Sequence, residues 1–433
     1  MEGFTLETTK QKLTFQSNYF SALFLWINYA FQGIATMVIV LQRDAIAYRL
    51  GTDLAGIAVI TSYIGWGRLF TVIPAGWLSD KFGRKISVLL AMVCYALFYG
   101  GVMISTNVWM AMAFTTFAGI GNSFLDTGTY PSLTELFPKH AAEATVLLRS
   151  FITIGQFLFP IGVAIIIAND LWFGYTFVIL LILLGLNALM ILMRKDLGHK
   201  GTARMSQAEL LEASNKQEKK QEAVKLNGKA NFWIEGVGLI SLGFTAVATF
   251  SLIGTWIPVV ATEVIGMDAV SSTLLSSYYS AAAFIGIFMT SGIIMTKKAK
   301  PTTVLFTWTL ISLLSLIGFR LVTTPAMAVL TSVLIGLFAA GGLFQLALAV
   351  LLELFPGGRG KYTAMMSFGA AIQALVVPLV TARLVDNPIS IITFAIVVTA
   401  SSTVVTFVVR LRHQKLTTPI EISAEEFETK LAN

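Results

Sequence analysis

Three ionisable residues, Arg68, Asp126 and Arg149, stand inside long apolar stretches of this 433-residue chain. Arg68 lies 12 residues before the loop residue Asp80, Asp126 lies 12 before Pro138, and Arg149 lies 11 after it. If these stretches are helices, a rise of about 1.5 Å per residue places each charge about 17–18 Å from the loops, at one common depth. Charges within a lipid-spanning helix are costly and rare, so the three residues are candidates for function.

The charge balance of this triplet suggests a ligand of opposite sign. Asp126 can neutralise only one of the two arginines, so a net charge of about +1 remains, or about +2 once Asp126 is protonated. A carboxylate substrate could supply the missing negative charge through a bidentate arginine contact, and protonation of Asp126 would release an arginine for it. The alternative is a structural Asp–Arg pair that fixes helix packing, with the other arginine reaching toward the membrane surface.

The composition indicates that most of the surface meets lipid. Of all residues, 56% are hydrophobic and 12% are charged, whereas soluble proteins carry about 25% charged residues. The net charge of +7 does not indicate nucleic-acid binding, because the basic residues lie in short loops between apolar runs. Cys94 is the single cysteine, and no metal-ligand spacing, phosphate-binding loop or nucleophile–base set is visible. We therefore expect no metal, no cofactor and no enzyme activity.

Twelve stretches reach the length of about 20 apolar residues that a helix needs to cross a lipid core of about 30 Å. They are 19–41, 54–78, 86–105, 108–134, 142–168, 171–193, 232–261, 270–295, 302–322, 326–352, 362–384 and 388–409. Of the 30 Lys and Arg residues, 24 fall on one side of these spans, whereas Arg43, Arg49, Arg320 and Arg383 fall on the other. Because cytoplasmic loops carry the excess of basic residues, we expect a multi-pass protein of the cell membrane with both termini in the cytoplasm.

A polar segment at 194–231 divides six spans from six. The expected organisation is a cytoplasmic tail at 1–18, a six-helix bundle at 19–193, the linker 194–231, a second bundle at 232–410 and a cytoplasmic tail at 411–433. Part of the linker, Met205–Ala223, could form an amphipathic helix on the membrane surface. A solvated linker and a regulatory segment both remain open.

The two halves share an ordered set of matching residues, which indicates a duplicated six-helix unit. The tetrapeptide ELFP occurs at 135–138 and again 218 positions later at 353–356. The other matches are Pro160 with Pro378, Tyr63 with Tyr279, and Gly76 with Gly292. Parallel repeats of this kind are typical of carriers that bind substrate between two halves and rock around it. Glycine pairs such as Gly341-Gly342 are expected to permit close packing or bending.

The loop between spans 2 and 3 reads GWLSDKFGRK at 76–85, and this run resembles the loop signature of the major facilitator superfamily. Gly76 and Gly83 would permit close helix approach and a tight turn, and Arg84 offers a fork for a carboxylate such as Glu135. The resemblance implies two pseudo-symmetric bundles of six helices, an all-α membrane fold, and transport by alternating access. It also implies that Asp80, Arg84 and Glu135 form a gate that latches the cytoplasmic side.

The second copy of the signature is degraded. Gly292 is followed by Lys297, Lys298 and Lys300 with no aspartate at the matching place, so Glu353 is expected to answer these lysines in a weaker latch.

Residues 125–131, LDTGTYP, are similar to a run in the YdiN/YdiM-like branch of bacterial inner-membrane permeases. This resemblance suggests a shikimate- or quinate-like acid as substrate. Span 4 lacks the arginine that often precedes its glycine in the superfamily, since Thr115 and Ala118 stand before Gly119. The proton-coupling role of that arginine therefore cannot be carried over to this chain.

The second half lacks the buried charges, so we expect an asymmetric site. At the repeat offsets, Arg68 becomes Phe284, Asp126 becomes Phe344 and Arg149 becomes Ser367. The first half should hold the charged end of the substrate, with further hydrogen bonds from Asn28, Gln32, Asn122, Tyr130 and Gln156. The second half should hold a ring or polyol face with Trp256, Tyr278, Tyr279, Gln345 and Gln373. Any one of these polar residues could instead serve only helix packing.

These features favour a monomeric secondary transporter that moves a small organic anion, driven by protons taken up at Asp126. A proton-driven exporter of amphiphilic compounds is the first alternative, although GQFLFPIG at 155–162 matches an antiporter signature only vaguely. A transporter-like nutrient sensor that signals through the linker is the second alternative.

Overall fold

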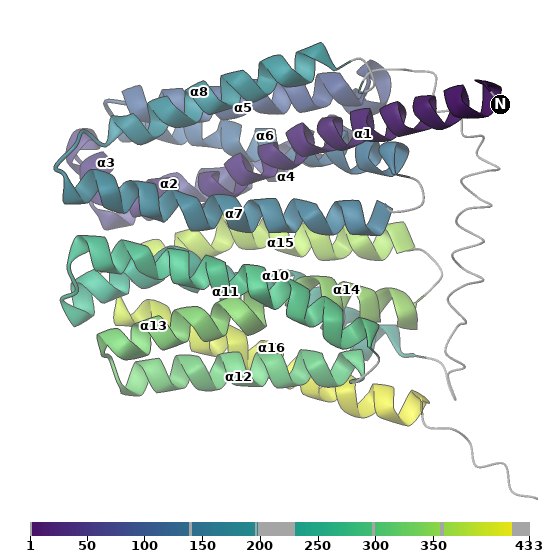
Figure 1. Ribbon diagram of the computed structural model, residues 1–433. Helices are drawn as coiled ribbons and strands as arrows, with labels where there is room; N and C mark the ends of the chain where they lie inside the picture. The colour runs from purple at the N-terminus through teal and green to yellow at the C-terminus, as the bar shows by residue number, and fades with distance from the viewer. Residues whose placement is uncertain are drawn as a thin grey trace, which may run out of the picture.

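The computed structural model shows helices and turns, and no strand, throughout the part of the chain that it describes: residues 2–137, 141–194, 197, 230–296, 299–355 and 359–417. Within this part, 11 helical segments are long and apolar enough to cross a membrane. The first helix, α1 (Glu2–Ala35), lies beside them (Figure 1). The predicted all-α membrane fold is confirmed.

Two groups of helices follow one another along the chain and stack as two bundles, one above the other in the view of Figure 1. The first contains α1, α2 (Val38–Leu41), α3 (Arg43–Leu50), α4 (Leu54–Phe82), α5 (Arg84–Ile104), α6 (Val108–Leu136), α7 (Ala141–Ala168) and α8 (Gly174–Met193). The second contains η2 (Phe232–Gly236), α10 (Val237–Val260), η3 (Ala261–Ile265), α11 (Ala269–Met295), α12 (Pro301–Leu321), α13 (Pro325–Leu334), η4 (Ile335–Ala340), α14 (Leu343–Leu354), α15 (Arg359–Ala382) and α16 (Ile389–Thr417). The face where α1 begins and α16 ends is called the terminal face below.

Polar side chains start the helices that run from the opposite face back to the terminal face. Asp53, Asn107 and Asp268 each accept a hydrogen bond from the backbone N–H three residues later, at 2.8–2.9 Å. Thr324 does the same for α13 at 3.3 Å. Each cap satisfies an N–H group that the first helical turn leaves without a partner. These polar residues therefore fix where α4, α6, α11 and α13 begin.

Two predicted spans differ from the helices observed. Span 1, expected at 19–41, begins as a helix at Glu2 and ends at Ala35, and the chain then continues through α2 and α3. Span 10, expected as one helix at 326–352, is divided into α13, η4 and α14 by a turn at Gly341-Gly342. The predicted linker at 194–231 lies almost wholly outside the described residues.

The break in span 10 depends on its two glycines. Gly342 has φ +144°, which a residue with a side chain rarely adopts. A Cβ on Gly341 would lie 2.7 Å from the Cα of Gly286 on α11, so the two backbones are in direct contact. The hydroxyl of Thr290 donates to the Gly341 carbonyl at 2.5 Å and so gives a partner to an acceptor at the turn.

The two bundles meet through contacts of α4 with α15 and of α7 with α11. A Cβ on Gly65 would lie 2.4 Å from the backbone nitrogen of Leu375. Ser277, early in α11, donates a hydrogen bond to the Phe157 carbonyl of α7 at 2.9 Å.

The matched glycines near the terminal face have open surroundings instead. A Cβ on Gly76 would meet only the Thr127 methyl at 4.0 Å, and one on Gly292 would meet nothing within 4 Å. The expected close helix approach at Gly76 is therefore absent from this conformation. The backbones of the two bundles lie in contact at Gly65 but leave Gly76 and Gly292 open.

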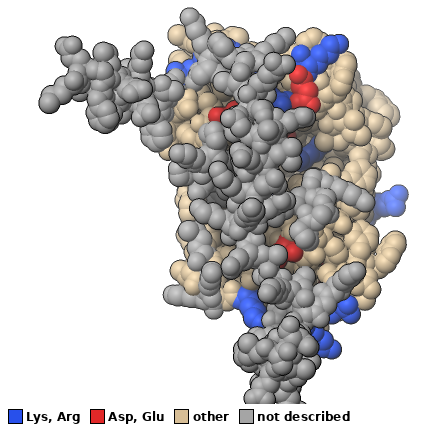
Figure 2. All heavy atoms as spheres, turned by 90° about the vertical axis from the view of Figure 1, so that its right-hand side faces the viewer, with Lys and Arg blue, Asp and Glu red and all other residues tan. Residues whose placement is uncertain are grey.

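Lys and Arg side chains stand around the margin of the terminal face (Figure 2). Among the residues described there, Lys81, Lys300 and Lys415 are exposed. The cytoplasmic placement of this face remains a prediction from the sequence.

Candidate functional site

Arg68 and Asp126 form an ion pair between α4 and α6. The Arg68 Nη2 atom lies 3.0 Å from Asp126 Oδ2, and the two side chains are 27% and 25% exposed. Two charges expected at a common depth from loop spacing are therefore in direct contact. Neither is sealed from solvent, so a ligand or water can reach the pair.

Two glycines bring α4 and α6 close enough for this pair to form. A Cβ on Gly67 would lie 2.1 Å from the Thr116 carbonyl oxygen, and one on Gly119 would lie 2.6 Å from the Arg68 nitrogen. Such distances are far below van der Waals contact, so no larger residue fits without separating the helices. Ser123 adds a hydrogen bond to the Arg68 carbonyl at 3.3 Å. Because of this close contact, Arg68 lies directly opposite Asp126.

Tyr29 of α1 is a third member of this group, and the sequence analysis missed it. Its hydroxyl donates to Asp126 Oδ1 at 2.9 Å, while its ring is buried in the core. Both carboxylate oxygens of Asp126 are thus occupied, one by Arg68 and one by Tyr29. No motif surrounds Tyr29, and a tyrosine in an apolar span is common, so its role could be found only from the packing of α1 against α6.

Arg149 of α7 stands apart from the ion pair. Among the described residues no carboxylate pairs with it, and its guanidinium lies 5.1 Å from the centre of the Phe250 ring on α10. That ring belongs to the other bundle, so this cation–π contact joins the two halves. Tyr130 lies within electrostatic range of Arg68, Asp126 and Arg149, and Tyr279 within range of Arg149. The three predicted charges therefore share one region, but only two of them are paired.

Tyr130 gives this region an accessible aromatic wall. Its side chain is 46% exposed, and its ring meets Tyr29 edge to face with the centroids 6.3 Å apart. The core side of the region is therefore closed by Tyr29, whereas Tyr130 stays available to a ligand.

The four other polar residues expected in the first half divide into two kinds. Asn28 is buried and accepts a hydrogen bond from Asn187 of α8 at 3.1 Å, and Asn122 accepts one from the Tyr95 hydroxyl of α5. Both therefore hold helices together.

Gln156 donates to the Thr36 hydroxyl at 3.2 Å and remains partly accessible. Gln32 is buried, and its Oε1 atom has no hydrogen-bond partner within the described structure. A Cβ on Gly33, the neighbour of Gln32, would lie 3.2 Å from Gln156 Cγ, so the two amides stand on helices in close contact. Of the four, Gln156 remains partly accessible, and Gln32 keeps a buried amide oxygen without a donor within the described structure.

The expected second-half residues are also unlike one another. Trp256 and Tyr279 are buried in the core, whereas Tyr278 and Gln345 are exposed. Gln373 donates to the Ser251 hydroxyl at 2.7 Å between α15 and α10. Tyr279 packs its ring against Gly254, where a Cβ would come within 2.7 Å. Of this set, Tyr279 is the residue that lies near a charge of the first half, through Arg149.

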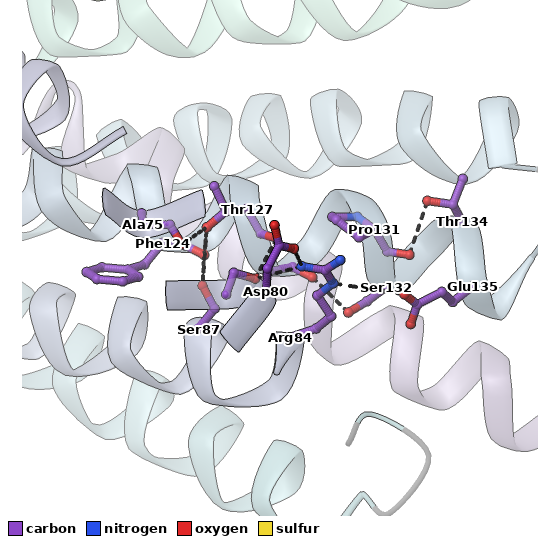
Figure 3. Close-up of polar contacts among 12 residues, drawn as sticks. Ala75, Asp80, Arg84, Ser87, Phe124, Thr127, Pro131, Ser132, Thr134 and Glu135 are labelled. Carbon is purple, nitrogen blue, oxygen red and sulfur yellow. Dashed lines mark hydrogen bonds and ion pairs between the residues drawn. The ribbon is translucent and has the colours of Figure 1, made fainter. Parts of the chain in front are cut away.

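The charged loop near the terminal face is also assembled, entirely within the first half (Figure 3). Arg84 forms an ion pair with Asp80, and its Nε atom lies 3.9 Å from Glu135 Oε1. Gly83 has φ +101°, which confirms that the turn between α4 and α5 requires a glycine. The expected contact of Arg84 with Glu135 is therefore present, and it is longer than the contact with Asp80.

Hydroxyl groups tie this loop to α6 beside Asp126 (Figure 3). Arg84 donates to the Ser79 hydroxyl at 3.3 Å, and Ser79 donates to the Thr127 carbonyl at 3.0 Å. Ser87 donates to the Phe124 carbonyl at 2.8 Å. The ends of α4 and α5 are thus fixed to the turn of α6 that carries Asp126.

The second-half gate differs from the expectation. Glu353 Oε1 lies 3.7 Å from His413 Nε2, so the carboxylate faces α16. Lys297 and Lys298 lie outside the described residues, and within them no ion pair joins Glu353 to Lys300. The end of α14 packs near the end of α16, which explains why a histidine of α16 is the nearest basic group.

Comparisons with known proteins place these features in a family context. The model of the Major Facilitator Superfamily matches residues 22–337. The chain is 31% identical to the inner membrane transport protein YdiM of Escherichia coli over 92% of its own length and 95% of that protein. It is 32% identical to YdiN of the same organism, with 84% and 83% covered. The crystal structure of a POT family transporter in complex with 5-aminolevulinic acid superposes with a TM-score of 0.70 at 16% identity, covering 93% of this chain and 96% of that one.

Proposed function

Because the chain belongs to the Major Facilitator Superfamily and is therefore a secondary transporter, we propose that it moves a small organic anion across the cell membrane by alternating access, coupled to protons. A hydroaromatic acid of the shikimate or quinate type is the substrate class we favour. The terminal face is then cytoplasmic. With that orientation, the close contact of the halves at Gly65 and the open surroundings of Gly76 correspond to an inward-facing conformation.

The observation that carries the anion proposal is an arginine without a carboxylate. Arg68 is neutralised by Asp126, but Arg149 has no carboxylate partner among the described residues and contacts the Phe250 ring. A cation at this depth is costly unless something balances it. A carboxylate substrate balances it at the moment of binding and gains charge-assisted hydrogen bonds from the guanidinium.

The neighbours of Arg149 suit a ring that carries hydroxyl groups. Phe250 and Tyr279 come from the second bundle and Tyr130 from the first, so a ring bound to Arg149 would contact both halves. Gln32 Oε1 is an acceptor still lacking a donor, and a substrate hydroxyl can supply one. These features support a hydroxylated cyclic acid over a plain fatty or amphiphilic anion.

Proton coupling follows from competition for Arg68. When Asp126 takes up a proton on a carboxylate oxygen, Arg68 loses its counter-ion and becomes a second cation near Arg149. Substrate binding is then favoured by both arginines. When the proton leaves, Asp126 recaptures Arg68 and only Arg149 still holds the anion. This exchange links one proton to one carboxylate without any other cofactor.

Uptake of radiolabelled shikimate and quinate into proteoliposomes under an imposed pH gradient tests the proposal. Asp126→Asn should abolish acceleration by the gradient but retain exchange of internal for external substrate, because Arg149 is intact. Asp44→Asn, at an exposed aspartate far from the site, is the matched control and should behave as wild type. Unchanged gradient-driven uptake in Asp126→Asn would remove the carboxylate from coupling.

A further inference from the structure

Arg410, near the end of α16, is a second cation without a counter-ion, far from the substrate site. Its Nε atom is buried and has no hydrogen-bond partner within the described structure. Its guanidinium lies 5.2 Å from the centre of the Phe306 ring on α12. Two carboxylates contact α16 near Arg410, but both face other residues: Glu235 pairs with Arg412, and Glu353 faces His413. Within the described residues, the Phe306 ring is therefore the contact that holds the Arg410 guanidinium between α12 and α16.

The contacts between α12 and α16 fix the depth and direction of Arg410. The hydroxyls of Thr309 and Thr406 are 2.9 Å apart, and the rings of Phe306 and Phe407 lie 5.3 Å apart. Arg410 follows Phe407 by three residues, so it lies one helical turn closer to the terminal face. It therefore stands where a lipid headgroup would meet the protein, just below the acyl chains.

The exposed face of α16 beside Arg410 is apolar. The exposed residues of α16 repeat at helical spacing, which places them on one stripe. They are Val404, Phe407, Val408 and Leu411, with exposures of 63%, 43%, 37% and 44%. On this stripe Lys415 follows Leu411 by four residues, and it is exposed. Arg410 borders the stripe on the side of α12.

Two further cations continue the site toward the terminal face. Lys415 lies five residues beyond Arg410, about 7.5 Å along α16, and Lys300 precedes Phe306 by six residues, about 9 Å along α12. Both side chains are exposed and neither belongs to an ion pair among the described residues. The site thus combines an apolar helix face, one half-buried guanidinium and two surface ammonium groups.

We propose that the surface where α12 and α16 meet binds the phosphate headgroup of an anionic phospholipid, with Arg410 as the principal contact. The two Nη atoms of the guanidinium form a planar fork that matches two phosphate oxygens, and Phe306 orients this fork. Lys300 and Lys415 supply the additional positive charge that distinguishes an anionic from a zwitterionic lipid. The acyl chains lie along Val404 and Phe407. This proposal is independent of the substrate and of proton coupling.

Native mass spectrometry of the purified protein tests the site, with phosphatidylglycerol, phosphatidylethanolamine and inorganic phosphate added separately. Wild type should retain one phosphatidylglycerol molecule in preference to phosphatidylethanolamine. Arg410→Gln should weaken this binding about tenfold, as expected when charge-assisted hydrogen bonds are lost. Arg410→Lys, which keeps the charge but loses the fork, should weaken it less.

Arg320→Gln at the other end of α12 is the matched control and should bind phosphatidylglycerol as wild type does. Phe306→Leu keeps the position apolar but removes the ring that contacts Arg410, and should also reduce retention. The proposal is overturned if Arg410→Gln retains the lipid unchanged, if phosphatidylethanolamine is retained equally well, or if inorganic phosphate binds as tightly as the lipid. If Arg410→Gln does not fold, Arg410→Lys and Phe306→Leu decide the question by the same readout.

Discussion

The two copies of the fourth span differ both in continuity and in charge. In the first bundle α6 runs unbroken from Val108 to Leu136 and carries Asp126 in its middle. In the second bundle the same span breaks at Gly341-Gly342 into α13, η4 and α14, and Phe344 occupies the matching position. The duplication has therefore kept a charged, continuous helix on one side and an uncharged, interrupted one on the other.

What the two copies still share is the close contact with the second span of each bundle. Gly67 and Gly119 bring α4 against α6, and Gly286 and Gly341 bring α11 against the divided span. Both second spans also begin with an aspartate cap, at Asp53 and Asp268. Scaffold contacts have thus been conserved between the halves while the chemistry of the site has diverged. Under the proposed function, the first bundle handles the charge of the substrate and the second supplies aromatic surface.

Moving the charge into the second bundle tests the comparison most severely. Phe344→Asp places an unpaired carboxylate in the middle of a span and should lower the free energy of unfolding by about 3 kcal/mol. Adding Phe284→Arg, which restores the pair at the repeat positions, should recover only part of this loss, because the break at Gly342 changes the register of α14. Thermal denaturation of the purified variants gives the answer. Full recovery of stability in the double variant would show that the second bundle accommodates an Asp–Arg pair despite the break at Gly342.

The break itself can be tested at Gly342. Gly342→Ala forces a side chain onto a backbone with φ +144° and should destabilise the protein by about 1–3 kcal/mol. Gly292→Ala, where a Cβ meets nothing within 4 Å, is the control and should leave the midpoint of thermal unfolding unchanged. Equal midpoints of thermal unfolding for the two variants would mean that the turn at Gly342 does not require a glycine.

Tyr29, the second partner of Asp126, is expected to make a smaller contribution. Tyr29→Phe removes one hydrogen bond to the carboxylate and should lower the free energy of unfolding by about 1 kcal/mol. Tyr99→Phe removes a hydrogen bond to a backbone carbonyl in the same bundle and serves as the control for the loss of a buried hydroxyl. Of the two, only Tyr29→Phe should alter how uptake responds to a pH gradient. An identical response in both variants would leave Tyr29 with a packing role alone.

The smallest expected effect concerns the shared helix caps. Hydrogen bonds from Ser271 hold the pKa of Asp268 below its usual value, so this carboxylate stabilises α11 above the usual carboxyl pKa and loses that contribution as the pH falls through the lowered value. Asp268→Asn keeps a side-chain acceptor for the Ser271 N–H but cannot titrate. Its unfolding midpoint should therefore depend less on acid pH than that of wild type. The same acid dependence in both proteins would contradict the cap.

The sequence was sufficient for the scaffold and for much of the ion pair. Long apolar runs predict the spans, and spacing from the loops places Arg68 and Asp126 at one depth because a helix rises uniformly. Three features could not be predicted in this way. The break at Gly342 depends on contact with α11. Tyr29 becomes a hydrogen-bond donor to Asp126 only through the packing of α1. Glu353 faces His413 because the ends of α14 and α16 lie close together. Each of these depends on tertiary contact between segments far apart in the chain.

Ligand-induced stabilisation of the purified protein tests the central claim most directly. Shikimate and its neutral carboxamide are compared on wild type and on Arg149→Gln, with Arg383→Gln as the control. We expect the acid to raise the unfolding midpoint of wild type and of Arg383→Gln. The amide should not raise it, and Arg149→Gln should lose the response to the acid. Equal stabilisation by acid and amide, or an undiminished response in Arg149→Gln, would contradict an anion site built on this arginine.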